Sequence, residues 1–170
     1  SAINSVPDTA VAILECTENE DHQMQRLADA RPNRFDFNYT IDGIKVTSKG
    51  KAAHACEPEK GLNAATNLVS LLCSSFGSRA LGNLCEFVDS YIGSDLKGKY
   101  LGIANKDKSG CLTLNVGKIE INSEGSYATL DIRYPVTSDP VVILNKIQTI
   151  ANSENLKVDV LGHMLPLNIP

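Results

Sequence analysis

The sequence predicts an α+β fold in which one antiparallel sheet is covered on one face by helices, and three observations support this prediction. Apolar and polar residues alternate on both sides of an Asp-Gly pair, which is typical of a β-hairpin. Stretches with helical spacing alternate with strand-like stretches along the chain. A strand–helix–strand unit between Asn4 and Gly43 is echoed between Asn122 and Gly162. We therefore expect two related, ferredoxin-like βαβ halves, with chance similarity of short stretches as the alternative.

The first half is predicted to contain a strand, a helix and a hairpin. Residues 8–15 form a short apolar, partly β-branched stretch, which predicts a strand. Thr17, followed by Glu20 three residues later, predicts the start of a short amphipathic helix. Residues 35–48 alternate between apolar and polar on either side of the Asp-Gly pair and therefore predict a hairpin.

The remainder of the chain is predicted to hold three helices and three strands. The helices are expected over residues 62–72, over residues 78–92, and after a cap at Thr137 or Ser138 with Pro140 in the first turn. The strands are expected over residues 111–116, 127–134 and 156–161. Residues 93–109 are rich in Gly, Lys, Asp and Ser, and this composition predicts a mostly exposed connection.

The composition restricts the classes of function. The 170 residues, 42% of them hydrophobic, are enough for one domain with a core of its own. The formal net charge is −4 and charges of both signs are interspersed, so no basic patch for nucleic acid is evident. The longest apolar run covers only residues 10–14, which predicts no membrane span, and no signal peptide is recognisable.

The cysteines and histidines do not form a recognisable site within the chain. The five cysteines are an odd number and widely spaced, which predicts reduced thiols in a cytoplasmic protein rather than a disulfide framework. The histidines, His22, His54 and His163, are far apart, and no His-Glu-x-x-His pattern links them. We therefore expect no complete metal site or catalytic triad within this chain.

The most informative segment runs from Gly50 to Asn63 and reads Gly-Lys-Ala-Ala-His-Ala-x-x-Pro-Glu-x-Gly-x-Asn. It places His54 among small residues at the end of a strand, just before a helix N-terminus. A histidine there could donate a hydrogen bond to a developing oxyanion, an effect worth roughly 3–4 kcal/mol. The alternative is a half-buried histidine whose ring is satisfied by a backbone carbonyl.

The same segment resembles the signature of the lid, or dimerisation, domain of the dinuclear-zinc aminoacylase and dipeptidase superfamily. Further matching motifs look most like the bacterial dipeptidase V branch: Asn-Ser-Val-Pro-Asp at 4–8, Leu-Gly-Ile-Ala at 101–104, Ser-Gly-x-Leu-Thr-Leu-Asn-x-Gly at 109–117 and Asp-Ile-Arg-Tyr-Pro at 131–135. The resemblance covers essentially the whole chain. It implies that residues 1–170 form a single lid domain, whose partner is a catalytic domain that holds two zinc ions outside this chain.

By motif position the resemblance implies three site residues. His54 would stabilise the tetrahedral intermediate, whereas Asn4 and Arg133 would help to hold the substrate. The planar fork of Arg133 suits a peptide carboxylate, and the amide of Asn4 offers both a donor and an acceptor. The alternatives are a surface salt bridge for Arg133 and a turn or cap role for Asn4. Asn63 and Gly61 are expected to shape the His54 loop.

The resemblance implies that the chain clamps the substrate of a cytoplasmic, zinc-dependent dipeptidase and is inactive on its own. The alternatives are the lid of an N-acyl amino acid deacylase or desuccinylase, and a non-catalytic module that binds a small molecule or dimerises. A long first βαβ unit favours a monomeric parent, because an enlarged lid would replace the second subunit of dimeric relatives. Cys56 departs from the family pattern, which commonly has serine at this position.

Overall fold

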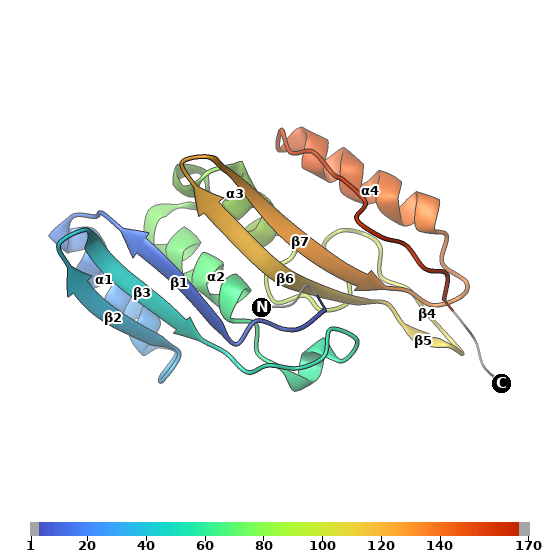
Figure 1. Cartoon of the computed structure of the whole chain (residues 1–170), viewed down its shortest axis with the longest axis horizontal. Coiled ribbons are helices and arrows are strands. Elements are labelled where there is room, and N and C mark those ends of the chain that lie inside the picture. The colour runs from blue at the N-terminus through green and yellow to red at the C-terminus, as the bar shows by residue number, and fades with distance from the viewer. Residues whose placement is uncertain (1–3, 167–170) are drawn as a thin grey trace.

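The computed structural model describes residues 4–166, and over these residues the predicted α+β fold is confirmed. Two main antiparallel sheets, of three and of two strands, lie side by side with helices behind them (Figure 1), and two very short strands pair as a third sheet. In chain order the elements are β1 Thr9–Leu14, α1 Glu18–Asp29, β2 Phe35–Thr40, β3 Gly43–Lys49, the 3₁₀ turn η1 Pro58–Lys60, α2 Ala64–Phe76, the 3₁₀ turn η2 Ser78–Leu81, α3 Asn83–Tyr91, the short paired strands β4 Lys106–Asp107 and β5 Gly110–Cys111, β6 Thr113–Asn122, β7 Gly125–Arg133 and α4 Pro140–Ser153.

The first sheet has the strand order β1-β3-β2 and confirms the predictions for the first half of the chain. β2 and β3 form the expected hairpin, with Thr40 opposite Gly43 beside the turn. Helix α1 begins at the expected capping box, where Thr17 Oγ1 accepts from the Glu20 N–H and a Glu20 carboxylate oxygen accepts from the Thr17 N–H. Because β3 lies between β1 and β2, this half is a split βαβ unit.

Helix α2 lies behind the two sheets and contributes to two hydrophobic cores (Figure 1). One side of α2, with Leu68, Leu71 and Leu72, packs against α1 and the first sheet. Another side, with Val69 and Cys73, packs against α3, α4 and the second sheet. Apolar residues around most of a helix are expected where the helix is buried in the middle of a domain. The middle of α2 is therefore held by both parts of the fold.

The second sheet pairs β6 with β7 and contains a bulge. The register shifts between Val116 and Lys118, so Gly117 is an extra residue on β6. An extra residue reverses which face the alternate positions occupy. Leu114, Val116 and Ile119 face the core. The opposite face of β6 therefore carries the odd-numbered residues before the bulge and the even-numbered residues after it.

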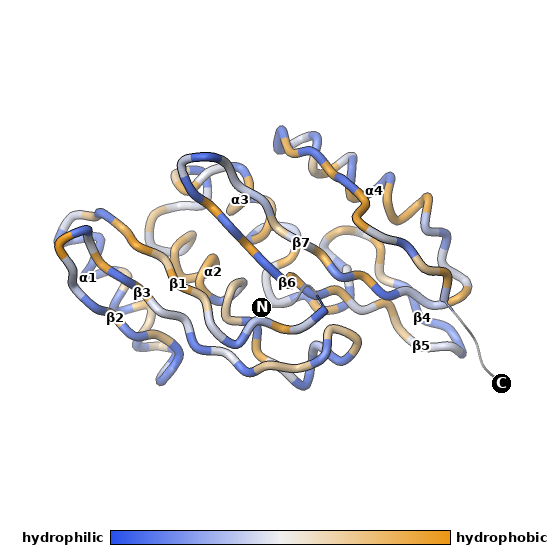
Figure 2. The backbone as a smooth tube through the Cα atoms, in the orientation of Figure 1, coloured by the Kyte–Doolittle hydropathy of each residue, from blue (hydrophilic) through white to orange (hydrophobic). Residues whose placement is uncertain are grey.

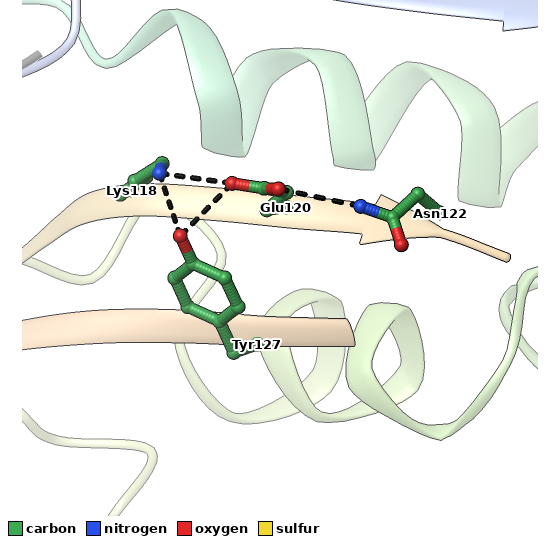
Figure 3. Close-up of polar contacts among 4 residues, drawn as sticks. All are labelled: Lys118, Glu120, Asn122 and Tyr127. Atoms are coloured by element: carbon green, nitrogen blue, oxygen red, sulfur yellow. Dashed lines mark hydrogen bonds and ion pairs between the residues drawn. The ribbon is translucent and has the colours of Figure 1, made fainter. Parts of the chain in front are cut away.

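Beyond the bulge this face carries a polar cluster at the hairpin end of the sheet (Figure 3). Lys118 Nζ donates to Tyr127 Oη at 2.6 Å and lies 2.8 Å from Glu120 Oε2. Tyr127 Oη donates to the same Glu120 oxygen at 2.9 Å. The hydrogen bonds that Lys118 donates to Glu120 and to Tyr127 raise the pKa of Lys118 above its usual range. The cluster joins the two strands where both are exposed to water.

The prediction of a strand over residues 156–161 is wrong. No strand forms there, although Leu156 and Val158 pack on the core while Lys157 and Asp159 are exposed. The alternating sequence is therefore explained by packing beside the second sheet and α4, without the backbone pairing of a ladder. The second half lacks its last strand, so the expected duplication is only partly realised.

The prediction of one continuous sheet is also wrong for the described residues, which form separate sheets. Residues 4–8, which lead into β1, lie beside β6 in Figure 1. There the side chain of Asn115 on β6 donates to the backbone oxygen of Ser5 at 3.0 Å. A side-chain contact thus takes the place of strand pairing between the two sheets.

Three local boundaries also differ from the prediction. The helix expected over residues 78–92 is divided at Gly82, whose φ of +96° ends the turn η2 before α3 begins. The connection after α3 is less exposed than expected, because Leu101 and Ile103 are buried in the core. Helix α4 is capped by Asp139, whose carboxylate accepts from the Val141 N–H at 2.8 Å, and not by Thr137 or Ser138.

Figure 2 shows hydrophobic and hydrophilic residues alternating along β6 and around α4. This alternation agrees with elements that each place one side against the core. Within residues 4–166, none of the helices has the length and apolar character needed to cross a membrane.

Candidate functional site

The structure brings Asn4 and His54 into paired backbone segments. The Val6 N–H donates to the Ala53 carbonyl at 2.9 Å, and the Ala55 N–H donates to the Asn4 carbonyl at 3.1 Å. Ser5 therefore lies opposite His54 in an antiparallel bridge. The side chains of Asn4 and His54 are both exposed. Two of the three residues predicted for the site thus lie on neighbouring strands of backbone.

Two glycines allow backbone segments to cross closely beside His54. A Cβ on Gly50 would lie only 2.2 Å from the carbonyl oxygen of Leu62, and a Cβ on Gly61 would lie 2.8 Å from that of Lys51. Lys51 and Leu62 exchange backbone hydrogen bonds of 2.9 and 2.8 Å at this crossing. The glycines of the Gly50–Asn63 motif are therefore needed for close backbone approach.

The ring of His54 is arranged as a hydrogen-bond donor. Its Nδ1 accepts a hydrogen bond from the backbone N–H of Cys56 at 3.3 Å. A ring nitrogen that accepts carries no proton, so the proton of the neutral imidazole lies on Nε2. The sequence left open a half-buried histidine whose ring donates to a backbone carbonyl. The structure differs on both counts, because His54 is exposed and its backbone partner is an N–H donor. The Nε2–H group can therefore donate to an oxygen of a bound molecule.

Arg133 lies at the end of β7 and forms a surface salt bridge, the alternative to substrate binding that the sequence left open. Its Nε lies 3.5 Å from Asp131 Oδ1, and the arginine side chain remains 46% exposed. Exposed ion pairs are worth roughly 0–1 kcal/mol. The guanidinium can therefore exchange this carboxylate for that of a ligand at low cost.

Two buried asparagine contacts connect these parts of the candidate site. Asn63 caps α2 by accepting from the Thr66 N–H at 3.1 Å, as expected of a helix-start residue. Its Nδ2 group donates to the carbonyl of Val116 at 2.8 Å and to Oδ1 of Asn115 at 3.2 Å. The loop that carries His54 is thereby joined to β6. Sequence reasoning missed the part played by Asn115, although a polar residue between Leu114 and Val116 in a strand was the signal that could have indicated it.

A cleft lies between α2, α3 and the connection that follows α3, and the end of the His54 loop, at Gly61 and Asn63, and Asn115 on β6 also line it. It has a volume of about 520 Å³, and its polar lining includes Arg31, Asn67, Ser70 and Asp89. Arg31 Nη2 donates to Ser70 Oγ at 3.2 Å. None of the three predicted site residues lines this cleft. The candidate site is therefore an exposed surface, on which bound substrate would need a second wall from outside residues 4–166.

The five cysteines are unpaired in the structure, and two of them lie in the core. Cys73 and Cys85 are buried, and burial raises the pKa of the Cys73 thiol to about 12 and also raises that of Cys85. Because the thiolate is the reactive form, these two cysteines behave as apolar core residues. Cys56 lies beside the site, half-buried, and its backbone N–H contacts the His54 ring.

A zinc site would draw its ligands from the His, Cys, Asp and Glu side chains that the structure describes. Within residues 4–166 no three His, Cys, Asp or Glu side chains lie close enough together to hold a metal ion. Zinc sites need three or four such ligands from the protein. We therefore expect isothermal titration of zinc into the isolated chain to show no stoichiometric binding. Tight uptake of two zinc ions per chain would contradict this expectation.

Comparison with known proteins finds relatives over most of the chain. It is 31% identical over 159 residues to "Putative dipeptidase YtjP" of Bacillus subtilis, a match that covers 89% of this chain and 34% of that protein. It is also 31% identical over 138 residues to a "Putative dipeptidase" of Staphylococcus epidermidis, covering 78% of this chain and 29% of that protein. The chain thus spans about a third of the length of these relatives. No family model matches the chain. The similarities to these relatives support a dipeptidase-family relationship for this chain.

Proposed function

We propose that the chain is the substrate-clamping lid domain of a zinc-dependent dipeptidase. The observation that carries this proposal is the backbone pairing of residues 4–6 with residues 53–55, which brings the segment of Asn4 alongside that of an exposed His54 whose Nε2–H is a donor. The dipeptidase relatives, about three times longer than the matched region, support a partial domain of such an enzyme. We place the two zinc ions of the proposal outside this chain, because its described residues offer no ligand cluster.

In this proposal His54 acts on charge that develops during hydrolysis. The Nε2–H group donates to the carbonyl oxygen of the scissile peptide bond as that oxygen becomes negative. A donor held in place before the reaction stabilises the transition state more than the ground state, because the negative charge exists only there. The hydrogen bond from the Cys56 N–H to Nδ1 keeps the ring in the tautomer that this step requires.

Arg133 and Asn4 hold the substrate in the same proposal. The guanidinium of Arg133 exchanges Asp131 for the terminal carboxylate of the dipeptide, to which it can donate two parallel hydrogen bonds. The side-chain amide of Asn4, exposed on the segment that pairs with the His54 backbone, offers one donor and one acceptor to the peptide backbone.

Replacing Arg133 with alanine in the longer protein is expected to raise KM for a dipeptide by about 10- to 100-fold. A hydrogen bond to a charged group is worth roughly 1.5–3 kcal/mol, and about 1.4 kcal/mol corresponds to a tenfold change in affinity. Steady-state kinetics measures this effect. The matched control is Arg26→Ala, at an exposed position on α1, which should leave KM unchanged. A wild-type KM in the Arg133 variant would show that the guanidinium does not bind substrate.

The substrate class is tested with the longer protein to which the chain is proposed to belong. We expect it to hydrolyse unblocked dipeptides faster than N-acetylated or N-succinylated amino acids. The reverse order would identify a deacylase or desuccinylase lid, because both substrate classes present a carboxylate to Arg133. Hydrolysis of neither class would instead support a non-catalytic binding or dimerising module and would contradict the proposal.

A further inference from the structure

Asn115 is a polar side chain buried in the middle of β6. Only 2% of its surface is exposed, and its neighbours along the strand, Leu114 and Val116, belong to the hydrophobic core. A buried amide is costly unless its polar atoms are hydrogen-bonded. Asn115 therefore depends on its contacts, and these contacts lie on the face of the sheet opposite to the core.

The contacts of Asn115 reach the two segments that carry the proposed site. Its Nδ2 group donates to the backbone oxygen of Ser5 at 3.0 Å, and its Oδ1 accepts from Nδ2 of Asn63 at 3.2 Å. Ser5 is the residue that lies opposite His54 in the backbone bridge. Asn63 closes the loop that begins at His54 and caps α2. One side chain thus contacts both the backbone opposite His54 and the residue that ends the His54 loop.

Asn115 also lies next to the part of β7 that carries Arg133. It is directly opposite Asp131 in the β6–β7 register, and Asp131 is the ion-pair partner of Arg133. Residues directly opposite in an antiparallel pair have neighbouring side chains on the same face. Asn115 therefore lies between Ser5, which is opposite His54, and β7, which ends at Arg133.

From this arrangement we propose that Asn115 is a positioning residue, which sets the place of Asn4 and His54 relative to Arg133. It acts through the backbone oxygen of Ser5 and does not contact the substrate. The consequence for catalysis rests on the function proposed above, whereas the consequence for local structure does not.

The local consequence is tested on the 170-residue chain by amide hydrogen exchange. In Asn115→Ala we expect the Val6 and Ala55 N–H groups, which pair the two segments, to exchange at least tenfold faster than in the wild type. The matched control is Asn122→Ala at the far end of β6. This substitution removes the hydrogen bond that Asn122 donates to Glu120 and the one that it accepts from the Glu124 N–H. It therefore lowers the stability of the chain, as Asn115→Ala does. The proposal requires that Asn122→Ala leave Val6 and Ala55 unchanged. Equal exchange in wild type and Asn115→Ala, or equal acceleration by both variants, would overturn the proposal.

The catalytic consequence is tested in the longer protein by a double-mutant cycle with His54. We expect Asn115→Ala to lower kcat for a dipeptide about tenfold in the wild type and to have little further effect in His54→Ala, because it acts through that residue. A full tenfold loss in both backgrounds would show that Asn115 does not act through His54. If the wild-type protein hydrolyses no dipeptide, the proposed function fails, and the exchange experiment alone decides whether Asn115 fixes the segment.

Discussion

Replacing Gly50 with alanine is expected to lower the free energy of unfolding of the chain by about 3 kcal/mol. The new methyl group would lie 2.2 Å from the carbonyl oxygen of Leu62, 2.9 Å from that of Pro7 and 2.9 Å from the nitrogen of Ala64. All three are backbone atoms of segments that cross next to the His54 loop, so no side chain can rotate away to make room. The clash must be relieved by separating the segments.

Urea denaturation followed by circular dichroism measures this loss directly. The matched control is Gly162→Ala, because a Cβ at Gly162 meets no atom within 4 Å and the residue is exposed. Substitutions at such surface positions usually change stability by no more than about 0.5 kcal/mol. A Gly50 variant as stable as the Gly162 variant would show that the close crossing of the three segments is not required for the fold.

Local signals in the sequence predicted the first half of the fold well. The capping box of Thr17 and Glu20 and the Asp-Gly hairpin depend on residues only a few positions apart, and both are present. The N-cap of α2 at Asn63 is local in the same way. Such elements are determined by short-range hydrogen bonds and by hydrophobic periodicity, which a single sequence displays.

The parts that the sequence did not predict depend on residues far apart along the chain. Apolar and polar residues alternate over residues 156–161 as they do in a strand. Whether these residues pair with a sheet depends on a free edge strand to pair with, and the alternation does not specify one. The two main sheets are separate, and the contact that connects them joins Asn115 to Ser5, which are 110 positions apart. The Gly117 bulge also determines which β6 side chains share a face, and it is visible only in the register with β7.

The candidate site divides in the same way. The small residues around His54 and the spacing to Asn63 indicated an open loop before a helix, and the structure agrees. The hydrogen bond from the Cys56 N–H to the ring, which determines the tautomer, arises from the turn geometry and has no signal in the sequence. The ion pair of Arg133 with Asp131 was anticipated as the ordinary alternative to substrate binding, and it coexists with an exposed guanidinium.

Replacing His54 with alanine has the largest expected effect on activity. The ring is exposed, and the backbone N–H of Cys56 is its hydrogen-bond partner, so the melting temperature of the chain should stay close to the wild-type value. The loss should instead appear in kcat, because in the proposed function the Nε2–H group donates to an oxyanion that exists only in the transition state and the intermediate. The matched control is His22→Ala. His22 is an exposed histidine on α1, and its removal should leave both stability and kcat unchanged.

The measurement that tests the lid proposal most directly is therefore kcat of His54→Ala for an unblocked dipeptide, determined in the longer protein. The proposal predicts a decrease of about 10²–10³-fold relative to the wild type, with an unchanged melting temperature. A His54 variant that folds normally and hydrolyses the dipeptide at the wild-type rate would contradict the proposal that this chain supplies the oxyanion donor.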